Sequence, residues 1–353
     1  MNKIPVAILG ATGAVGQRFV QLLENHPWFR VAALSASEQR VGQRYGASCR
    51  WVLDGDMPAS VRDLPLLPPT AEALNCRLAF SALPSNVAGP IEEELARAGL
   101  AVCSNASSHR MDEDVPLIIP EINPDHVDLI AVQQRRRSWP GLLVTNSNCT
   151  SMPVVIALKP LMDSFGVRAA HVVSLQALSG AGYPGLSSLD MLDNILPYVS
   201  GEEPKLETEP LKMLGHLRGE RVEPAAITLS AQCNRVAVRD GHVVCLSVAL
   251  ERKAAPAEVK DALRAYRGAV ASLRLPSAPD PLIVVREEDD RPQPRRDRDA
   301  GAGMAVVVGR VQRCPVLDIK LVALSHNTIR GAAGGSILNA ELLVARGLLE
   351  VPR

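Results

Sequence analysis

Aromatic residues are scarce in this sequence, and neither sign of charge is in excess. Phe, Trp and Tyr make up 3% of the 353 residues, so the core must be built mainly from Leu, Val, Ile and Ala. Lys plus Arg and Asp plus Glu number 38 each, so no net field draws the chain to nucleic acid or to a membrane surface. No apolar run approaches the roughly 20 residues of a membrane span. These absences argue against nucleic-acid and membrane partners and predict a soluble globular protein.

Closely spaced cysteines are missing as well. The sequence has no CxxC pair and no cysteine with a histidine at zinc-ligand spacing, so we expect no metal site. Its seven cysteines are scattered, at positions 49, 76, 103, 149, 233, 245 and 314. An odd number without a disulfide framework predicts reduced thiols. The first apolar run is too short for a signal-peptide core and ends in glycines, so we expect a cytoplasmic protein.

Strand and helix patterns alternate over residues 1–148. Short apolar runs predict strands at 5–9, 29–36, 78–83 and 100–106. Helical periodicity lies between them, most clearly at 86–99. This alternation predicts a parallel sheet covered on both faces, that is, a Rossmann-like dinucleotide-binding domain. We expect a closing helix within 327–353 to return to this domain.

The pattern changes over residues 149–326. Long β-rich runs predict strands at 167–178, 242–251, 304–313 and 317–325, and an amphipathic helix is predicted at 256–273. We therefore expect an α/β chain whose second domain is α+β with a mixed sheet. Two charge-rich stretches, 133–141 and 286–299, are expected to be solvated loops.

A glycine-rich turn, GATGAVG over 10–16, lies between the first predicted strand and the first predicted helix. Gly10 would permit the tight turn, Gly13 the approach of a pyrophosphate to the backbone, and Gly16 close packing of the helix. The helix N-terminus would then hold the phosphate charge. The turn predicts a dinucleotide site.

The end of the second predicted strand indicates which dinucleotide binds. NAD-binding proteins usually place Asp or Glu there to hold the ribose 2′-hydroxyl. Here the segment supplies Ser35, Ser37 and Arg40, and its one acid, Glu38, falls beyond the strand. Hydroxyls and an arginine suit a 2′-phosphate, so NADP is favoured. The alternative is a capped turn with one exposed arginine.

Cys149 lies where a predicted strand, 142–146, meets a predicted helix, 150–162. Ser147 and Asn148 are residue types that suit a helix N-cap. Unpaired N–H groups and the helix dipole at such a junction favour the nucleophilic thiolate. The alternative interpretation is a small buried apolar side chain, as for most free cysteines.

A reactive cysteine beside a dinucleotide site predicts redox chemistry between an aldehyde and an acyl group, with the carbon held on sulfur. Such chemistry needs a base, usually histidine. His242 stands out because it follows an Asp-Gly turn and opens a predicted strand. Arg235, seven residues earlier, suits bidentate binding of a carboxylate.

Seven long segments, in order along nearly the whole chain, carry a family resemblance. They are GATGAVGQ (10–17), DVPLIIPEIN (114–123), SNCTS (147–151), QALSGAGYPG (176–185), DNILPYVSGEEPK (193–205), SAQCNRVAVRDGH (230–242) and HNTIRGAAGGSILNAELL (326–343). The chain resembles the aspartate-semialdehyde dehydrogenases, specifically the branch found in archaea, fungi and some bacteria. One departure is Ala237, where the family resemblance leads us to expect proline.

The resemblance implies NADPH-dependent reduction of L-aspartyl 4-phosphate to L-aspartate 4-semialdehyde, in the biosynthesis of lysine, threonine, methionine and isoleucine. Cys149 would form the thioester, His242 would be the acid–base, and Gln176 would orient the substrate. The backbone N–H of Cys149 or Thr150 would stabilise the oxyanion.

The same resemblance implies roles for binding residues. Arg235 would hold the substrate carboxylate, Glu202 its ammonium, and Arg110 with Lys205 its phosphate, while Asn148 would contact substrate or phosphate. The cofactor-binding residues expected in addition to those above are Thr12, Ala14, Val15, Ser81, Ser179, Gly180 and Asn327.

Other functions are compatible with parts of this pattern. Malonyl-CoA reductase is the nearest alternative, because it would share the thiol, the histidine and the NADPH site. N-acetylglutamyl-phosphate reductase matches the motifs less well. A Cys149–His242 thiol hydrolase would leave the glycine turn without a purpose. A non-catalytic NADP sensor would leave the nucleophile without one. By resemblance we expect a homodimer or homotetramer joined through the second domain's sheet.

Overall fold

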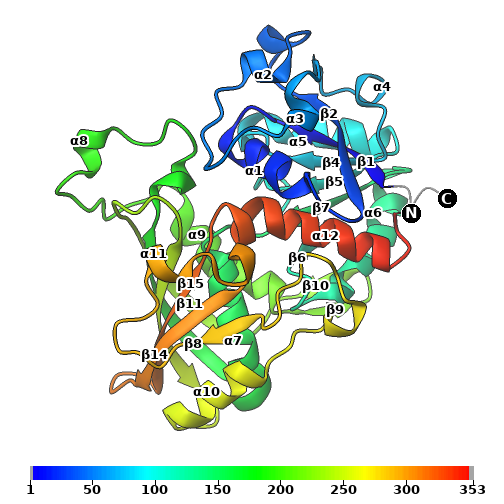
Figure 1. The fold of residues 1–353 in the computed structure, drawn as a ribbon. Helices are drawn as coiled ribbons and strands as arrows, with labels where there is room; N and C mark the ends of the chain where they lie inside the picture. Colours follow the sequence, from blue (N-terminus) through cyan, green and yellow to red (C-terminus); the bar gives the residue numbers. More distant parts are fainter. Residues whose placement is uncertain (1–2, 350–353) are drawn as a thin grey trace.

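The computed structural model describes residues 3–349, which form two large sheets with helices packed on them (Figure 1). The first sheet has seven strands, all parallel, in the order β3-β2-β1-β4-β5-β7-β6. Its strands are β1 (Ile4–Leu9), β2 (Phe29–Ser35), β3 (Leu66–Leu67), β4 (Leu78–Ser81), β5 (Ala101–Ser104), β6 (Leu117–Ile118) and β7 (Leu142–Asn146). The strand order reverses between β1 and β4, the position at which open α/β sheets bind ligands.

Alternate side chains of each strand in this sheet supply different layers of the core. Ile4, Val6 and Ile8 of β1 pack with the helices α1 (Ala14–Leu23) and α12 (Gly334–Ala345) on one face. Ala7 and Leu9 face the other way, toward α5 (Ser85–Arg97). The C-terminal helix α12 therefore lies in the core of the first sheet, although it follows the last strand of the second (Figure 1).

The second sheet has six strands in the order β11-β8-β12-β15-β14-β13 and mixes directions. The central pairs β8–β12, β12–β15 and β14–β15 are antiparallel, and the pairs β8–β11 and β13–β14 are parallel. Its strands are β8 (Val167–Gln176), β11 (Thr228–Arg235), β12 (His242–Leu250), β13 (Ile283–Val285), β14 (Val306–Arg313) and β15 (Ile319–Ser325). The predicted mixed sheet is confirmed.

One face of the second sheet is covered by helices. Val244, Leu246 and Val248 of β12 pack with residues of α7 (Ser151–Phe165) and α10 (Pro256–Ala265). The helix α9 (Glu202–Met213) joins the same core through Leu206 and Met213. The opposite face carries Cys245, which is exposed.

The remaining elements are short or peripheral. They are α2 (Tyr45–Ser48), α3 (Ala59–Arg62), α4 (Ala71–Leu74), α6 (Leu129–Arg137), α8 (Ser188–Met191), α11 (Pro294–Asp297), the hairpin β9 (His216–Arg218) and β10 (Arg221–Glu223), the 3₁₀ turns η1 (Glu38–Arg40), η2 (Pro124–Asp128), η3 (Leu178–Ala181), η4 (Ala271–Leu273) and η5 (Ala300–Gly303), and the π-helical turn η6 (Ile329–Ala333). The segment around α8 projects from the body of the molecule (Figure 1). Among residues 3–349, no helix combines the length and apolar character needed to cross a bilayer.

Three predicted segments differ from the structure. The helix predicted at 256–273 ends at Ala265, because Tyr266 is extended, with a ψ of 122°, and its hydroxyl donates to the carbonyl of Glu121 at 3.2 Å. Gly268, with a φ of +75°, then turns the chain away from a helical path. Most of the stretch 133–141 is not a loop but the end of α6, with Trp139 buried behind it. The stretch 286–299 is not fully solvated, because it encloses the buried carboxylate of Asp297.

Ion pairs with the buried carboxylates of Asp114 and Asp297 explain why these charged stretches fold. Arg137 donates two hydrogen bonds to Asp114, at 2.6 and 2.7 Å. Asp297 accepts from the Nε atoms of Arg286 and Arg291, at 3.2 and 2.6 Å. The division after residue 148 stays a prediction, and residues 350–353 of the predicted closing segment lie outside the described residues.

Candidate active site

Cys149 lies in the turn between the carboxyl end of β7 and the first turn of α7. Thr150 is the N-cap position, and its own side chain caps no N–H group. Asn148 caps the helix instead, because its Oδ1 accepts hydrogen bonds from the N–H groups of Thr150 and Ser151, at 2.8 and 3.2 Å. Of the two predicted capping residues, Asn148 has that role, whereas the Ser147 hydroxyl donates to the carbonyl of Asn148 at 3.2 Å.

The structure brings the predicted nucleophile and base together. The Sγ of Cys149 lies 3.3 Å from Nε2 of His242, the first residue of β12. The other ring nitrogen, Nδ1, accepts a hydrogen bond from the N–H of Ala177 at 3.0 Å. A nitrogen that accepts carries no proton, so the neutral ring holds its proton on Nε2 and directs it at the sulfur. Burial lowers the pKa of His242 to about 3, and the nearby Arg235 adds to this effect.

The surroundings of the sulfur favour the thiol over the thiolate. Burial and the charge of Glu202 raise the pKa of Cys149 to about 12, although Arg110 and Arg235 act in the opposite direction. The start of the helix does not give the sulfur the expected hydrogen bonds, for a structural reason. The N–H groups of Thr150 and Ser151 already bind Asn148 and are not available to the sulfur.

Of the two N–H groups predicted to stabilise an oxyanion, only one is available. The N–H of Thr150 is occupied by Asn148. The N–H of Cys149 has no acceptor among the described residues. Cys149 therefore keeps a free donor beside its own sulfur, the position at which an oxyanion on a sulfur-bound carbon would form.

Cys149 opens into a cavity of about 360 Å³. Gln176, Gly180, Glu202 and Arg235 line it, together with Leu186, Leu196, Tyr198, Val199 and Ser200. A guanidinium and a carboxylate on the walls give the cavity one group for a substrate carboxylate and one for an ammonium. The apolar residues come from the projecting segment around α8, so that segment forms one wall of the site.

Hydrogen bonds fix the polar walls of this cavity. Glu202 accepts from Nδ2 of Asn148 at 2.9 and 3.0 Å, from Lys205 at 3.0 Å, and from Gln176 at 3.4 Å. Arg235 donates to the carbonyl of Ala177 at 2.7 Å, so the peptide groups flanking one residue orient both Arg235 and His242. These contacts hold the side chains in place before any substrate arrives.

The two residues predicted to bind phosphate, Arg110 and Lys205, do not line the cysteine cavity. Arg110 is buried and does not line the cavity. It donates to Glu209 at 2.9 Å and to the carbonyl of Asn105 at 2.7 Å. Lys205 is held by Glu202 on its own helix. Both cations therefore have carboxylate partners in the free protein.

Sequence reasoning missed the residues that hold the nucleophile turn. Glu209, at 2% exposure, accepts from Arg110 and, at 2.8 Å, from the N–H of Asn148. Lys212 donates to the carbonyls of Arg110, Asp112 and Val115 at 2.7–2.8 Å. The sequence did contain a signal for these residues. Glu209 lies seven residues after Glu202, and Lys212 lies seven residues after Lys205, which places all four side chains on one side of α9.

A second missed contact lies behind the cysteine. A Cβ on Gly331 would be 2.7 Å from Cβ and 2.9 Å from Cα of Cys149, so the turn η6 touches the backbone of Cys149. The preceding residue, Arg330, is fully buried and forms two hydrogen bonds of 2.7 Å with Glu121. This ion pair anchors η6 to the chain segment that follows β6.

The glycine turn has the shape expected for a dinucleotide site. Gly10 has a φ of +70°, and a Cβ on Gly16 would lie 2.3 Å from the carbonyl oxygen of Gly10. Gly13 precedes α1 and has an open side, because its Cβ would meet only Gly10 at 3.4 Å. Thr12 belongs to the turn, and Ala14 and Val15 begin the helix.

The residues predicted to select NADP lie around the carboxyl end of β2. Ser35 is buried, and its hydroxyl has no hydrogen-bond partner among the described residues. Ser37, which precedes η1, and Arg40, the last residue of η1, are both exposed, and Arg40 donates to the carbonyl of Ser48 at 3.3 Å. Ser81 ends β4, the neighbour of β1. A buried hydroxyl without a partner and an open glycine turn fit a phosphate-bearing dinucleotide.

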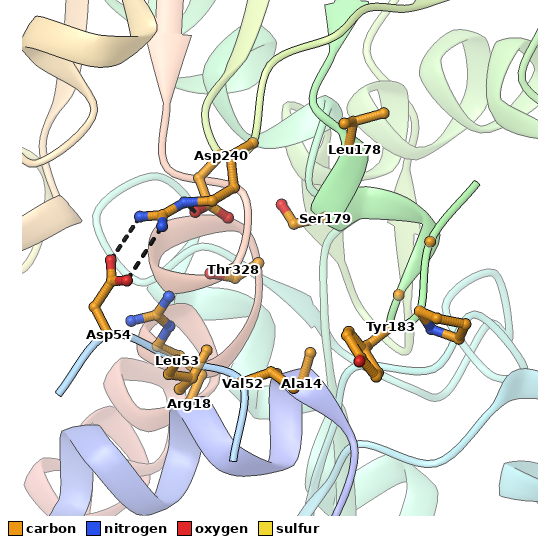
Figure 2. A pocket seen from close by; sticks show the side chains of 14 residues that line it. Ala14, Arg18, Val52, Leu53, Asp54, Leu178, Ser179, Tyr183, Asp240 and Thr328 are labelled. Atoms are coloured by element: carbon orange, nitrogen blue, oxygen red, sulfur yellow. Dashed lines mark hydrogen bonds and ion pairs between the residues drawn. The ribbon is translucent and has the colours of Figure 1, made fainter. Parts of the chain in front are cut away.

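A second cavity, of about 220 Å³, lies beside the start of α1. Ala14 and Arg18 line it on one side, and Ser179 and Thr328 line it on the other (Figure 2). Asn327 donates to Ser179 at 2.8 Å and accepts from the N–H of Gly241 at 2.8 Å. The cavity thus joins the glycine turn to the loop that carries the next residue, Gly180.

The loop that contains Ser179 and Gly180 borders both cavities. Gly180 lines the cysteine cavity, whereas its neighbour Ser179 lines the cavity beside α1. A Cβ on Gly180 would lie 2.7 Å from Arg235 and 3.0 Å from the ring of His242. The predicted cofactor residue Gly180 is therefore placed against the side chains of Arg235 and His242. Across the second cavity, Asp54 and Arg239 form two hydrogen bonds, drawn as dashed lines in Figure 2.

Comparisons with known proteins match both parts of the chain. Residues 5–130 match the family model described as semialdehyde dehydrogenase, NAD binding domain, and residues 158–330 match semialdehyde dehydrogenase, dimerisation domain. The aspartate-semialdehyde dehydrogenase of Archaeoglobus fulgidus is 49% identical over 98% of this chain and 100% of its own length. The Saccharomyces cerevisiae protein of the same name is 43% identical over 99% of this chain and 100% of its own length.

A solved structure is similar over the whole fold. The crystal structure of aspartate semialdehyde dehydrogenase with NADP from Candida albicans has a TM-score of 0.91 and 42% identity, covering 98% of this chain and 100% of that one. An aspartate semialdehyde dehydrogenase II from Vibrio cholerae, complexed with ASA, has a TM-score of 0.75 and 25% identity, covering 98% and 99%.

Proposed function

The chain belongs to the aspartate-semialdehyde dehydrogenase family, and we propose how its residues divide the work of that reaction. The enzyme reduces L-aspartyl 4-phosphate to L-aspartate 4-semialdehyde with release of phosphate, in the biosynthesis of lysine, threonine, methionine and isoleucine. One observation carries the assignment of roles. A thiol 3.3 Å from an imidazole opens into a cavity lined by Gly180, and the neighbouring Ser179 lines the second cavity beside the start of α1.

Cys149 is the proposed acyl carrier. Its sulfur attacks the acyl carbon, the carbon–oxygen bond to phosphate breaks, and the thiol proton leaves with the phosphate or to solvent. NADPH, when bound, supplies the hydride that reduces the acyl carbon. The free N–H of Cys149 stabilises the acyl oxygen, which becomes negatively charged when the sulfur or the hydride adds to the acyl carbon.

His242 is the proposed acid–base residue. Because the N–H of Ala177 occupies Nδ1, the Nε2 proton points at the sulfur. In this tautomer the ring donates a hydrogen bond that stabilises the sulfur when it leaves the carbon as a thiolate, and a proton from solvent then restores the thiol. Because the ring is held in this tautomer, it interacts with the sulfur through Nε2 only.

The cavity walls are proposed to recognise the rest of the substrate. Arg235 binds the α-carboxylate through its guanidinium, and Glu202 binds the ammonium. Gln176 and Asn148, both hydrogen-bonded to Glu202, orient the acyl group.

The phosphate is proposed to compete for two cations that are already paired. Lys205 and Arg110 are held by Glu202 and Glu209 in the free protein. A phosphate bound beside Cys149 would attract both cations, because Arg110 already acts electrostatically on this sulfur.

NADP is the cofactor of the family, as in the Candida albicans structure solved with it, and we propose which residues hold it. The glycine turn and the start of α1 (Gly10, Thr12, Gly13, Ala14, Val15 and Gly16) would take the pyrophosphate. Ser35, Ser37 and Arg40 would take the 2′-phosphate. Ser81, Ser179, Gly180 and Asn327 would border the remainder.

We also propose that the chain forms a homodimer or a homotetramer through the second sheet. The match to a dimerisation domain supports an oligomer. The uncovered face of that sheet supports the location, because Val173, Cys245 and Val322 form a partly exposed row across three strands. A cytoplasmic location is proposed on the seven free thiols.

A phosphate-dependent assay tests the proposed function. The purified protein should reduce NADP when aspartate semialdehyde and phosphate are both present, and the rate should vanish when phosphate is omitted. Malonyl-CoA with NADPH is the control, and the comparisons give no support to this alternative substrate. Turnover of malonyl-CoA without turnover of aspartate semialdehyde would contradict the proposal.

A further inference from the structure

The helix α9 presents four charged side chains at spacings of three, four and three residues: Glu202, Lys205, Glu209 and Lys212. Glu202 lines the substrate cavity and Lys205 pairs with it. Glu209 and Lys212 continue the same side of the helix but are buried away from the cavity. The first pair has a proposed role in substrate binding, whereas the second pair has none.

Glu209 connects two parts of the site that are far apart in sequence. One carboxylate oxygen accepts from Arg110 at 2.9 Å, and the other accepts from the N–H of Asn148 at 2.8 Å. Asn148 in turn caps α7 through Oδ1 and binds Glu202 through Nδ2. Three separate groups thus hold the residue before Cys149, and Glu209 is the one that accepts from its backbone N–H.

The turn that carries Arg110 is fixed from the same helix. Lys212 donates to the carbonyls of Arg110, Asp112 and Val115, so a buried ammonium replaces the hydrogen bonds that this irregular turn lacks. Arg110 is buried as well, and Glu209 is the carboxylate that compensates its charge. Both ends of the Arg110–Glu209–Asn148 connection are therefore rigid.

We propose that Glu209 is a positioning residue: it holds the turn of Cys149 in place and neutralises Arg110 until an anionic substrate arrives. The inference rests on the proposed role of Cys149 as the acyl carrier. It assigns no contact with substrate to Glu209.

The electrostatic part of this proposal can be isolated, because the charges around the sulfur are few. Glu202 of α9, Arg110, Arg235 of β11 and the imidazole of His242 face Cys149 from the elements packed around it. Of these groups, Arg110 is the one that Glu209 compensates. Removing the charge of Glu209 leaves Arg110 uncompensated and makes the surroundings of the sulfur more positive.

The Glu209→Gln substitution keeps the shape but offers one acceptor in place of two. Its amide NH₂ must face either Arg110 or the N–H of Asn148, both of which are donors. We expect kcat to fall about 100-fold, the effect of misplacing a reacting group by roughly 1 Å. KM for aspartate semialdehyde should stay within about threefold of the parent value, because Arg235 and Glu202 are untouched.

Alkylation of Cys149 supplies a measurement that a purely structural role would not change. The ratio of the rate with anionic iodoacetate to the rate with neutral iodoacetamide reports the local charge. We expect this ratio to rise about threefold or more in Glu209→Gln, at constant ionic strength. Cys103 and Cys233, both fully buried, must remain unmodified, which shows that the variant is folded.

Two further variants complete the test. Glu207→Gln is the matched control, since Glu207 lies on the same helix and accepts from the N–H of Ala231 at 2.9 Å, but makes no hydrogen bond or ion pair with the cysteine turn among residues 3–349. It should retain both the parent kcat and the parent alkylation ratio. Glu209→Asp keeps the charge but shortens the reach, so kcat should fall while the ratio stays at the parent value.

Two results would overturn the proposal. One is a kcat for Glu209→Gln within threefold of the parent. The other is an unchanged alkylation ratio, which would leave Glu209 with a structural role alone. If the parent protein fails to oxidise aspartate semialdehyde, the proposed function fails, but the alkylation ratio still decides whether Glu209 controls the charge at Cys149.

Discussion

Replacing Gly331 by alanine should inactivate the enzyme while leaving its cofactor site intact. The new Cβ would lie 2.7 Å from Cβ and 2.9 Å from Cα of Cys149. Carbon atoms not bonded to each other prefer separations of about 3.5–4.0 Å, so the two backbones must move apart by roughly 1 Å. The turn η6 cannot yield freely, because the buried pair of Arg330 and Glu121 anchors it. The movement therefore falls mainly on Cys149.

The magnitudes follow from these distances. Overpacking a rigid site costs about 1–3 kcal/mol of stability. A displacement of about 1 Å at the nucleophile costs about 100-fold in rate. The 3.3 Å contact between the sulfur and His242 should lengthen by a similar distance. We expect kcat/KM to fall about 100-fold and the unfolding free energy to fall by about 1–3 kcal/mol.

The assay combines steady-state kinetics, thermal unfolding and NADPH titration by fluorescence. Gly89→Ala is the control, because its Cβ would make an ordinary contact of 3.5 Å with His109 and it lies within α5. That variant should keep its activity and be as stable as the parent or more so. A Gly331→Ala enzyme with kcat/KM within twofold of the parent would refute the reasoning.

Three other expectations can be tested with simple variants or buffers. Arg235→Lys should lower kcat/KM by about 100-fold, because one ammonium cannot reproduce the guanidinium fork, and an unchanged value would refute the carboxylate-binding role. Arg40→Ala should weaken NADPH binding more than NADH binding, and equal losses in the two titrations would remove Arg40 from the 2′-phosphate site. Alkylation of Cys149 by iodoacetamide should rise about tenfold per pH unit between about pH 6 and 9 without a plateau, because the pKa of about 12 keeps the thiolate a minor species that grows as pH rises. A plateau near neutral pH would show that the free enzyme already holds a thiolate.

Periodicity made most of the fold predictable. The short apolar runs before and after the glycine turn correspond to β1 and β2, and the β-rich runs after residue 166 correspond to β8, β12, β14 and β15. Local pattern was insufficient where a distant contact decided the structure. The helix α10 ends early because Tyr266 is extended and binds Glu121, and the stretch 286–299 folds around the buried carboxylate of Asp297.

The site was predictable to the extent that its chemistry resides in recognisable motifs. Cys149, His242, Gln176, Glu202 and Arg235 come together as the resemblance implied. The protonation state of Cys149 was not predictable, because burial and the capping by Asn148 depend on tertiary structure.

The supporting residues escaped prediction for a related reason. Glu209, Lys212 and Gly331 act through contacts with segments about 60 to 180 residues away in the chain. No local pattern separates a buried helix carboxylate that binds an arginine from an exposed one. Only the structure shows which partner each side chain meets.

The central claim is that the sulfur of Cys149 carries the acyl group. Mass spectrometry of the parent enzyme, mixed with aspartyl phosphate in the absence of NADPH and quenched in acid, tests it directly. The account predicts an aspartyl thioester on the peptide that contains Cys149, which disappears when NADPH is added before the quench. An enzyme that turns over normally but carries the adduct on another residue, or on none, would contradict the account.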